Sequence, residues 1–150
     1  MIKVSKVMSH SDEVVYDFII NMFADQFKIK PDRLLNHRYK TTMKYKKSSI
    51  PVEQSVTELV LNQRIEFVTS YGDQAIRSAY WLEKQGEHKT KVTLSEDGSS
   101  DKKTIDLNYK LFSFPLLNSS AKKKLKMRLY QIDRAIIDRE IKSDSQEGNE

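Results

Sequence analysis

The sequence contains no cysteine, few glycines and no long apolar run, and each of these absences excludes a class of structure. Without cysteine the chain forms no disulfide, no thiolate metal site and no cysteine nucleophile, which fits a reducing compartment. Its four glycines stand singly, so no glycine-rich phosphate loop is present. No apolar run is long enough to span a bilayer, and the alternating charged and apolar residues at the start do not resemble a signal peptide. These absences predict a cytoplasmic protein with no membrane span.

Length and composition indicate one folded unit. The chain has 150 residues, of which 38% are hydrophobic and 31% charged, values ordinary for a globular domain. We predict a single domain over residues 1–142. Residues 143–150 are polar and acidic and have no large apolar side chain to bury, so they are expected to form a disordered tail.

The hydrophobic periodicity of the first third predicts a strand, a helix and a bend. Val4 and Val7 belong to a strand that ends near Ser9. Ser11 is a plausible N-cap for a helix whose apolar residues recur at the helical period as far as Phe27. Pro31 favours a short helical turn after it, because proline suits a first helical position.

From His37 onward the period changes to two, which predicts strands with one buried face. The expected strands lie near residues 37–46, 56–61, 65–71, 76–82 and 90–94. Turns are expected around Ser48 to Pro51 and at Asp97 to Asp101, with short connections between the other strands. Such short connections predict an antiparallel sheet, because parallel neighbours need long crossovers.

The last third ends in a second amphipathic helix, expected over residues 117–141. Residues 104–114 fit either a strand or a helix, and Pro115 ends whatever precedes it. Asn118 or Ser119 is expected to cap the helix. Its apolar stripe, able to lie across a sheet, consists of Leu125, Leu129, Ile132 and Ile136.

This α+β order resembles the START-like, birch-pollen-allergen-like helix-grip fold of the SRPBCC superfamily. This resemblance rests on the opening strand and the start of the first helix, the bent helical connection, the antiparallel strands and the closing helix. More narrowly, the motifs Tyr80 to Glu83, Lys89 to Leu94, and Lys122 through Asp133 are similar to those of an uncharacterised family of small bacterial proteins from low-GC Gram-positive organisms within that superfamily. The resemblance implies a curved antiparallel sheet of about six to seven strands with the C-terminal helix packed across it. It also implies a ligand site between these two layers, since members bind lipids, sterols or polyketides there and a few are cyclases or hydrolases.

Inward-facing aromatic residues make a ligand cavity plausible, because their apolar bodies fill a curved sheet incompletely and their hydroxyls can orient a ligand. A fully packed core explains the same pattern, and both readings stay open. Tyr16 and Trp81 are expected in surface or secondary packing. The predicted cavity residues are Tyr39, Met43, Tyr45, Phe67, Tyr71, Tyr80, Leu125 and Leu129.

Positive charge is concentrated in the 37–46 strand and at the start of the last helix. There, like charges stand four residues apart at the helix end where the dipole disfavours cations. Lys122, Lys123 and Lys126 are therefore candidates for binding an anion or an acidic protein partner, and a solvated face is the alternative. Nucleic-acid binding is not expected, because no aromatic residues are interleaved with the basic ones of the patch.

Enzyme chemistry has weaker support in the sequence. His10, His37 and His88 are isolated and are expected to be ordinary exposed histidines, so no metal site is predicted. Asp106 is the one carboxylate noted within an apolar alternation and could act as a base, although a solvent-facing role is favoured. We predict no cofactor and assign no catalytic residue. The leading hypothesis is binding of a small, mostly apolar or amphipathic molecule; the alternatives are an interaction protein with a basic surface and a cyclase- or hydrolase-type enzyme.

Overall fold

The structure of the chain, a computed structural model, describes residues 1–45, 47–72, 74–100 and 121–147. Its elements follow the predicted α+β order. In sequence they are β1 (Ile2–Met8), α1 (Asp12–Phe27), the 3-10 turn η1 (Pro31–Arg33), β2 (Tyr39–Tyr45), β3 (Ser48–Val60), β4 (Arg64–Tyr71), β5 (Gln74–Gly86), β6 (Lys89–Ser100) and α3 (Ala121–Glu147).

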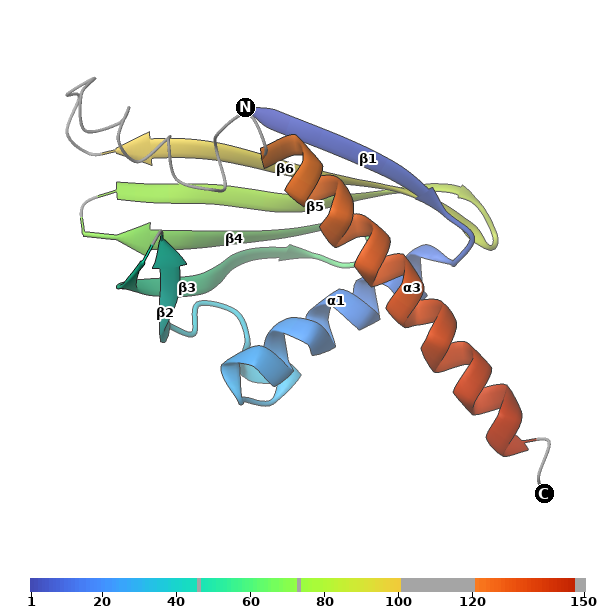
Figure 1. Cartoon of the computed structure of the whole chain (residues 1–150). Helices are drawn as coiled ribbons and strands as arrows, with labels where there is room; N and C mark the ends of the chain where they lie inside the picture. The colour runs from blue at the N-terminus through green and yellow to red at the C-terminus, as the bar shows by residue number, and fades with distance from the viewer. Residues whose placement is uncertain (46, 73, 101–120, 148–150) are drawn as a thin grey trace.

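The strands form one antiparallel six-stranded sheet in the order β1-β6-β5-β4-β3-β2. Both helices pack on the same face of this sheet, which we call the inner face (Figure 1). Helix α3 crosses the sheet obliquely, and its C-terminal part extends beyond the strands (Figure 1). Side chains fill the space between the sheet and the two helices, and a cavity remains only where they do not meet.

Helix α1 begins and ends through local interactions that the sequence encodes. The Ser11 Oγ accepts a hydrogen bond from the Val14 amide at 3.2 Å, which confirms the predicted N-cap. At the other end Lys28 adopts a left-handed conformation with φ of 58°, and its amide bonds back to the last turn. The residues buried against the sheet are Val15, Ile19, Phe23, Ala24 and Phe27.

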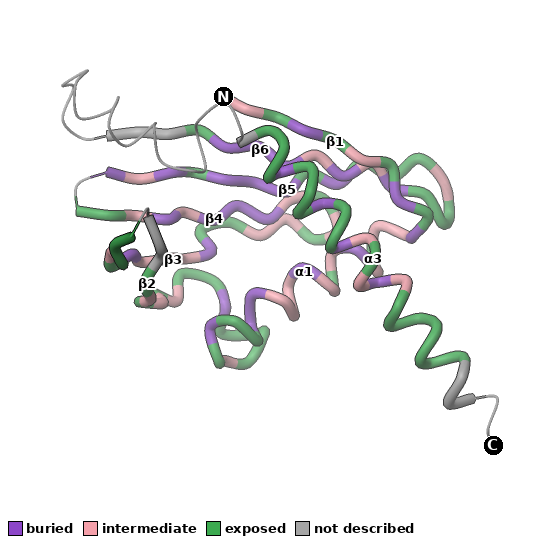
Figure 2. The backbone as a smooth tube through the Cα atoms, in the orientation of Figure 1, coloured by how far each residue is buried: buried purple, intermediate pink, exposed green. Residues whose placement is uncertain are grey.

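The predicted stripe of α3 forms the centre of the core. Leu125, Leu129, Ile132 and Ile136 are each at most 3% exposed. Figure 2 shows buried positions recurring between exposed ones where α3 lies over the sheet, and exposed positions alone where α3 leaves it. The packing confirms that the last helix closes the inner face.

Two predicted turns are wrong, and the structure shows why. Pro51 lies inside β3, opposite Thr42 of β2. The register of β3 with β4 runs only from Glu53 to Val60, so no strand on that side needs an amide donor from Pro51. The stretch from Asp97 to Ser100 continues β6, because β5 is long enough to pair with it to the end.

The last helix also runs further than the sequence indicated. It continues to Glu147, so residues 143–147 are helical where we expected a disordered tail. This stretch contains no helix breaker before Gly148, and polar residues are acceptable on a helix that has left the core. The predictions for residues 104–114, Asp106, Pro115 and the cap at Asn118 or Ser119 lie outside the described residues.

Candidate functional site

A cavity of about 310 Å³ lies between the inner face, α1 and α3; we call it the inner cavity. Among the described residues, its apolar lining consists of Phe18, Met22, Phe23, Phe67, Ile132 and Ala135. Its polar lining consists of Gln26, Gln54, Tyr80, Arg128 and Gln131. The volume is at the lower end of the range of about 300–1000 Å³ that is usual for small-molecule sites.

Helix α3 supplies one wall of the inner cavity through a single flank. Arg128, Gln131 and Ala135 stand three to four residues apart, so they share a side of the helix next to the buried stripe. The opposite flank, with Lys126, Met127 and Tyr130, faces β1 instead. One helix therefore separates two surfaces of different character.

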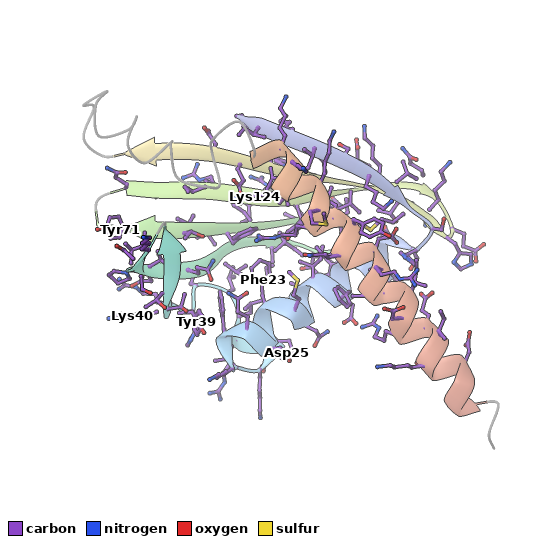
Figure 3. All side chains as sticks on the ribbon, in the orientation of Figure 1. Phe23, Asp25, Tyr39, Lys40, Tyr71 and Lys124 are labelled. Carbon is purple, nitrogen blue, oxygen red and sulfur yellow. The ribbon has the colours of Figure 1, made fainter. Side chains whose placement is uncertain are left out.

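Aromatic rings form the floor of the inner cavity. The Phe23 ring of α1 lies 4.9 Å from that of Phe67 and 6.4 Å from that of Tyr80, measured between centroids. Phe67 and Tyr80 are stacked at 5.8 Å with an interplanar angle of 23°. In Figure 3 the labelled Phe23 side chain lies between α1 and the sheet. Such rings present a rigid apolar surface at small entropic cost.

Two buried polar groups lie near the polar wall: Tyr80, which lines the inner cavity, and Glu96, which does not line it but lies close enough to Tyr80 and Arg128 to interact with both electrostatically. Tyr80 is fully buried and Glu96 is 2% exposed. Glu96 occupies the inner face of β6 two positions beyond Leu94, the cross-strand partner of Tyr80. Among the described residues, no hydrogen-bond partner reaches the Glu96 Oε2, and only Arg128 approaches the Tyr80 Oη, without a well-aligned hydrogen bond. Unpaired buried polar atoms are rare and costly, so they mark a place where a ligand or water is expected.

Burial shifts the ionisation of both groups, and Arg128 opposes it. Desolvation raises the pKa of Glu96 from 4.5 to about 7, while the positive charge of Arg128 lowers it. Desolvation likewise raises the pKa of Tyr80 to about 12; Arg128 again acts in the lowering direction, and Glu96 adds a further increase. A fixed cation and a neutral hydroxyl on the wall therefore stand beside a buried carboxyl group whose pKa is raised towards neutral pH.

A chain of amides bridges α1 and the sheet at the edge of the inner cavity. The Gln26 Nε2 donates to the Gln54 Oε1 at 2.8 Å, and the Gln54 Nε2 donates to the Thr69 Oγ1 at 3.3 Å. Gln26 and Gln54 both line the cavity. Their hydrogen bonds fix the position of α1 relative to β3 and β4, which holds this side of the cavity in place.

The structure brings only some of the predicted cavity residues to the inner cavity. Phe67 and Tyr80 line it. Tyr39 instead stacks on Phe27 at 4.9 Å, and Leu125 and Leu129 belong to the packed core under α3. Tyr71 shares the inward parity of Phe67 but stands at the end of β4 and is 43% exposed (Figure 3). The side chains of Met43 and Tyr45 lie outside the described part of the chain.

Two expectations about other aromatic and histidine residues have different outcomes. Trp81 is 38% exposed. Its indole N–H donates to the Ser95 Oγ at 3.0 Å, and the Arg64 guanidinium lies 4.3 Å from the centre of its ring, so the expected secondary packing is confirmed.

The expectation of an exposed His10 is wrong. His10 is 5% exposed because its Nε2 lies 2.7 Å from Asp133 Oδ1 of α3. His88 is exposed in the turn between β5 and β6, as expected.

Sequence reasoning missed Glu96 and Arg128. The signal for Glu96 was present, since Thr90, Val92 and Leu94 alternate inward and Glu96 is the next position of the same parity. It was overlooked because Asp97 and Gly98 suggested a turn. Arg128 belongs to the basic start of the last helix and is exposed like its neighbours there; only the packing angle of α3 places it at the edge of the inner cavity.

The predicted basic residues lie away from the inner cavity. Lys123 and Lys126 border a shallow groove of about 520 Å³ between α3 and β1, together with Ser5, Lys6, Met127, Leu129 and Tyr130. We call it the basic groove. Met127 and Tyr130 are 51% and 57% exposed, and the Lys6 Nζ lies 5.8 Å from the centre of the Tyr130 ring. Lys122 is exposed but does not line the groove.

Metal and membrane chemistry have no visible basis in the described residues. No group of three or more histidine, cysteine, aspartate or glutamate side chains there is arranged to hold a metal ion. None of the described helices combines the length and the apolar character needed to cross a membrane.

Solved structures similar to this chain share its fold at very low sequence identity. Norcoclaurine synthase of Thalictrum flavum, a point mutant in complex with a transition-state analogue, is 7% identical with a TM-score of 0.63, over 93% of this chain and 94% of that one. The aromatase/cyclase ZhuI of a Streptomyces species is 12% identical with a TM-score of 0.58, over 90% and 94%. Ara h 8.0201 is 9% identical with a TM-score of 0.57, over 90% and 93%. These likenesses confirm the helix-grip fold and carry no activity with them.

The sequence comparison gives a family but no function. No curated protein has a sequence that matches this chain. Residues 2–116, which include β1 to β6 and so most of the inner face, match a family described as a domain of unknown function (DUF3284). The chain belongs to this DUF3284 family.

Proposed function

We propose that this protein binds a small, mostly apolar molecule in the inner cavity. The carrying observation is the cavity itself, about 310 Å³ lined by aromatic and aliphatic side chains with a few polar groups on one wall. This combination is typical of small-molecule sites, where apolar surface provides affinity and a few polar groups fix orientation. Two solved structures of the same fold are named as a synthase and an aromatase/cyclase, which supports a small-molecule role for this architecture.

A neutral fluorescent probe tests the proposal directly. N-phenyl-1-naphthylamine is uncharged at neutral pH and brightens in apolar surroundings, so saturable enhancement reports on binding. Ala135→Trp places a large ring in the inner cavity and should abolish the saturable signal. Arg134→Trp is the matched control, because Arg134 is the preceding residue of α3, is exposed and does not line the cavity.

The two variants decide the outcome together. Loss of probe binding in Ala135→Trp with retention in Arg134→Trp supports binding in the inner cavity. Equal binding by both variants, with unchanged unfolding midpoints, would show that the probe binds elsewhere and would contradict the proposal.

A second candidate function is binding of an acidic partner at the basic groove. The supporting observation is that Lys6, Lys123 and Lys126 surround the exposed apolar side chains of Met127 and Tyr130. Cations around exposed apolar surface suit a partner segment with both acidic and apolar residues.

Charge reversal tests this second candidate. Lys123→Glu with Lys126→Glu should abolish binding of a synthetic peptide of alternating glutamate and leucine, measured by fluorescence anisotropy. Lys84→Glu with Lys142→Glu changes the net charge equally at exposed positions away from the groove. Equal loss with both pairs would indicate general charge attraction and contradict a specific site.

A further inference from the structure

The polar wall of the inner cavity is built differently from its apolar floor. Tyr80 and Glu96 are buried on the inner face of neighbouring strands; among the described residues only Arg128 approaches the Tyr80 hydroxyl, and no hydrogen bond reaches the Glu96 Oε2. Arg128 lines the same cavity from α3 and acts electrostatically on both groups. A buried hydroxyl and a cation therefore share one wall with a buried carboxyl group close behind them, and a purely apolar ligand would satisfy none of the three.

We propose that this wall is an anion subsite: Arg128 and the Tyr80 hydroxyl bind the acidic group of a small amphipathic monoanion, and Glu96 joins them in its protonated form. The inference rests on the proposed function and specifies its ligand class. The apolar body of the ligand lies against Phe23 and Phe67, and its carboxylate or sulfonate faces the wall.

The protonation states favour an anion over a cation. The Tyr80 hydroxyl keeps its proton throughout the physiological range, so it is available as a donor. Arg128 is always charged and only donates. When Glu96 is protonated, all three groups can donate to an anionic acceptor and the wall carries one positive charge. A cationic ligand would meet Arg128 at close range and would offer the Tyr80 proton no acceptor.

Glu96 makes the subsite sensitive to pH. Its cross-strand neighbours on the inner face, Ile2 and Ser78, do not titrate. Among the described residues, the charged and titratable groups that interact with it are Arg128 from α3 and Tyr80 from β5. An anion placed beside Glu96 favours its protonated form, so binding takes up a proton near neutral pH. As the pH rises and Glu96 ionises, its negative charge repels the ligand and affinity falls.

A matched pair of probes tests the subsite. Anilinonaphthalene sulfonate and N-phenyl-1-naphthylamine share one apolar body and differ by the sulfonate, and neither titrates between mildly acidic and mildly basic pH. We expect the sulfonate to bind more tightly at mildly acidic pH. Arg128→Gln should weaken its binding about tenfold, the typical effect of losing a charged hydrogen bond, and should change binding of the neutral probe by less than about twofold. Lys142→Gln, an exposed position of α3 with the same charge change, should alter neither.

The pH dependence of sulfonate binding tests the role of Glu96 separately. Sulfonate affinity should fall several-fold from mildly acidic to mildly basic pH in the unsubstituted protein and stay level in Glu96→Gln. Calorimetry in two buffers of different ionisation enthalpy should show proton uptake that Glu96→Gln abolishes. Retained binding of the neutral probe in each variant shows that the cavity is still folded.

The outcomes separate the subsite from the proposed function. If neither probe is sensitive to Ala135→Trp, the ligand-binding proposal itself fails. If the neutral probe binds in the cavity but Arg128→Gln weakens both probes equally, the anion subsite is overturned and the proposed function stands. Loss of sulfonate binding in Lys126→Gln, with none in Arg128→Gln, would assign the anion to the basic groove and would also overturn the subsite.

Discussion

His10 Nε2 lies 2.7 Å from Asp133 Oδ1, although the two residues are 123 positions apart in sequence. A carboxylate oxygen only accepts, so Nε2 carries the proton of this hydrogen bond. The His10 Nδ1 lies 3.7 Å from the Glu140 Oε1, and the Thr90 hydroxyl donates to the His10 carbonyl oxygen at 2.8 Å. The junction between β1 and α1 is thereby attached to α3, and this attachment holds the helix in the position that forms the inner cavity.

The first prediction concerns the energy of this attachment. A double-mutant cycle of His10→Phe and Asp133→Asn should give a coupling free energy of about 1–3 kcal/mol by urea unfolding, because the hydrogen bond is partly buried and its acceptor is a carboxylate. The exposed pair Arg134 and Asp138 on α3 serves as the control and should couple by less than about 0.5 kcal/mol. Similar coupling in both cycles would contradict a special role for His10.

The second prediction concerns the pH dependence of stability. Because folding raises the pKa of Glu96 from 4.5 to about 7, folding favours its protonated form. Its contribution to stability is complete below about pH 4.5, is lost as the pH rises through about 7, and is level above that. The shift corresponds to about 3 kcal/mol.

Glu96→Gln removes this ionisation while preserving shape, so it should stabilise the protein by about 1–3 kcal/mol near pH 8 and have little effect near pH 4. Urea unfolding at both pH values measures the difference. A stabilisation independent of pH would show that Glu96 does not titrate in this window.

The third prediction compares the two sides of α3. Leu129→Ala should destabilise the protein by about 2–5 kcal/mol, because Leu129 is 1% exposed and its truncation leaves a cavity under the helix. Met127→Ala, at a position that is 51% exposed, should change the unfolding free energy by less than about 0.5 kcal/mol. Equal effects in chemical denaturation would mean that α3 does not pack on the sheet as described.

The fourth prediction concerns the start of α1. Ser11→Ala removes the acceptor of the Val14 amide and should cost about 1 kcal/mol of stability, whereas Ser11→Asp should retain the cap. Thermal unfolding of the three proteins distinguishes the cap from a general effect of the position. A melting temperature that falls equally in both variants would contradict the capping role.

Local patterns in the sequence were sufficient for most elements of the fold. The stripe from Leu125 to Ile136 and the cap at Ser11 depend on residues a few positions apart, and both were predicted correctly. Pro51 and Gly98 were misassigned because their strands are sustained by pairing with β2 and β5, which local composition does not encode.

The site was less predictable than the fold. The alternation of residues along a strand shows which face of the sheet a side chain lies on, but not whether the helices cover that part of the strand. Phe67 and Tyr71 share the inward face of β4, yet Phe67 lies under the helices and Tyr71 stands at the exposed strand end. The polar wall depends on Arg128 meeting Tyr80 and Glu96 from another layer, and His10 meets Asp133 in the same way. These contacts between residues of different layers depend on the angle at which α3 crosses the sheet.

The edge position of β2 has a consequence for how the sheet meets a second copy of the chain. Strand β2 is the outermost strand of the sheet on the side opposite β1, so one of its backbone edges has no neighbour in the strand order. Lys40 is exposed on β2 (Figure 3), whereas Arg38, just before this strand, is paired with Glu53 of β3. Positive charge on a terminal strand opposes the docking of a second copy edge to edge, and so protects the chain from aggregating through its own sheet.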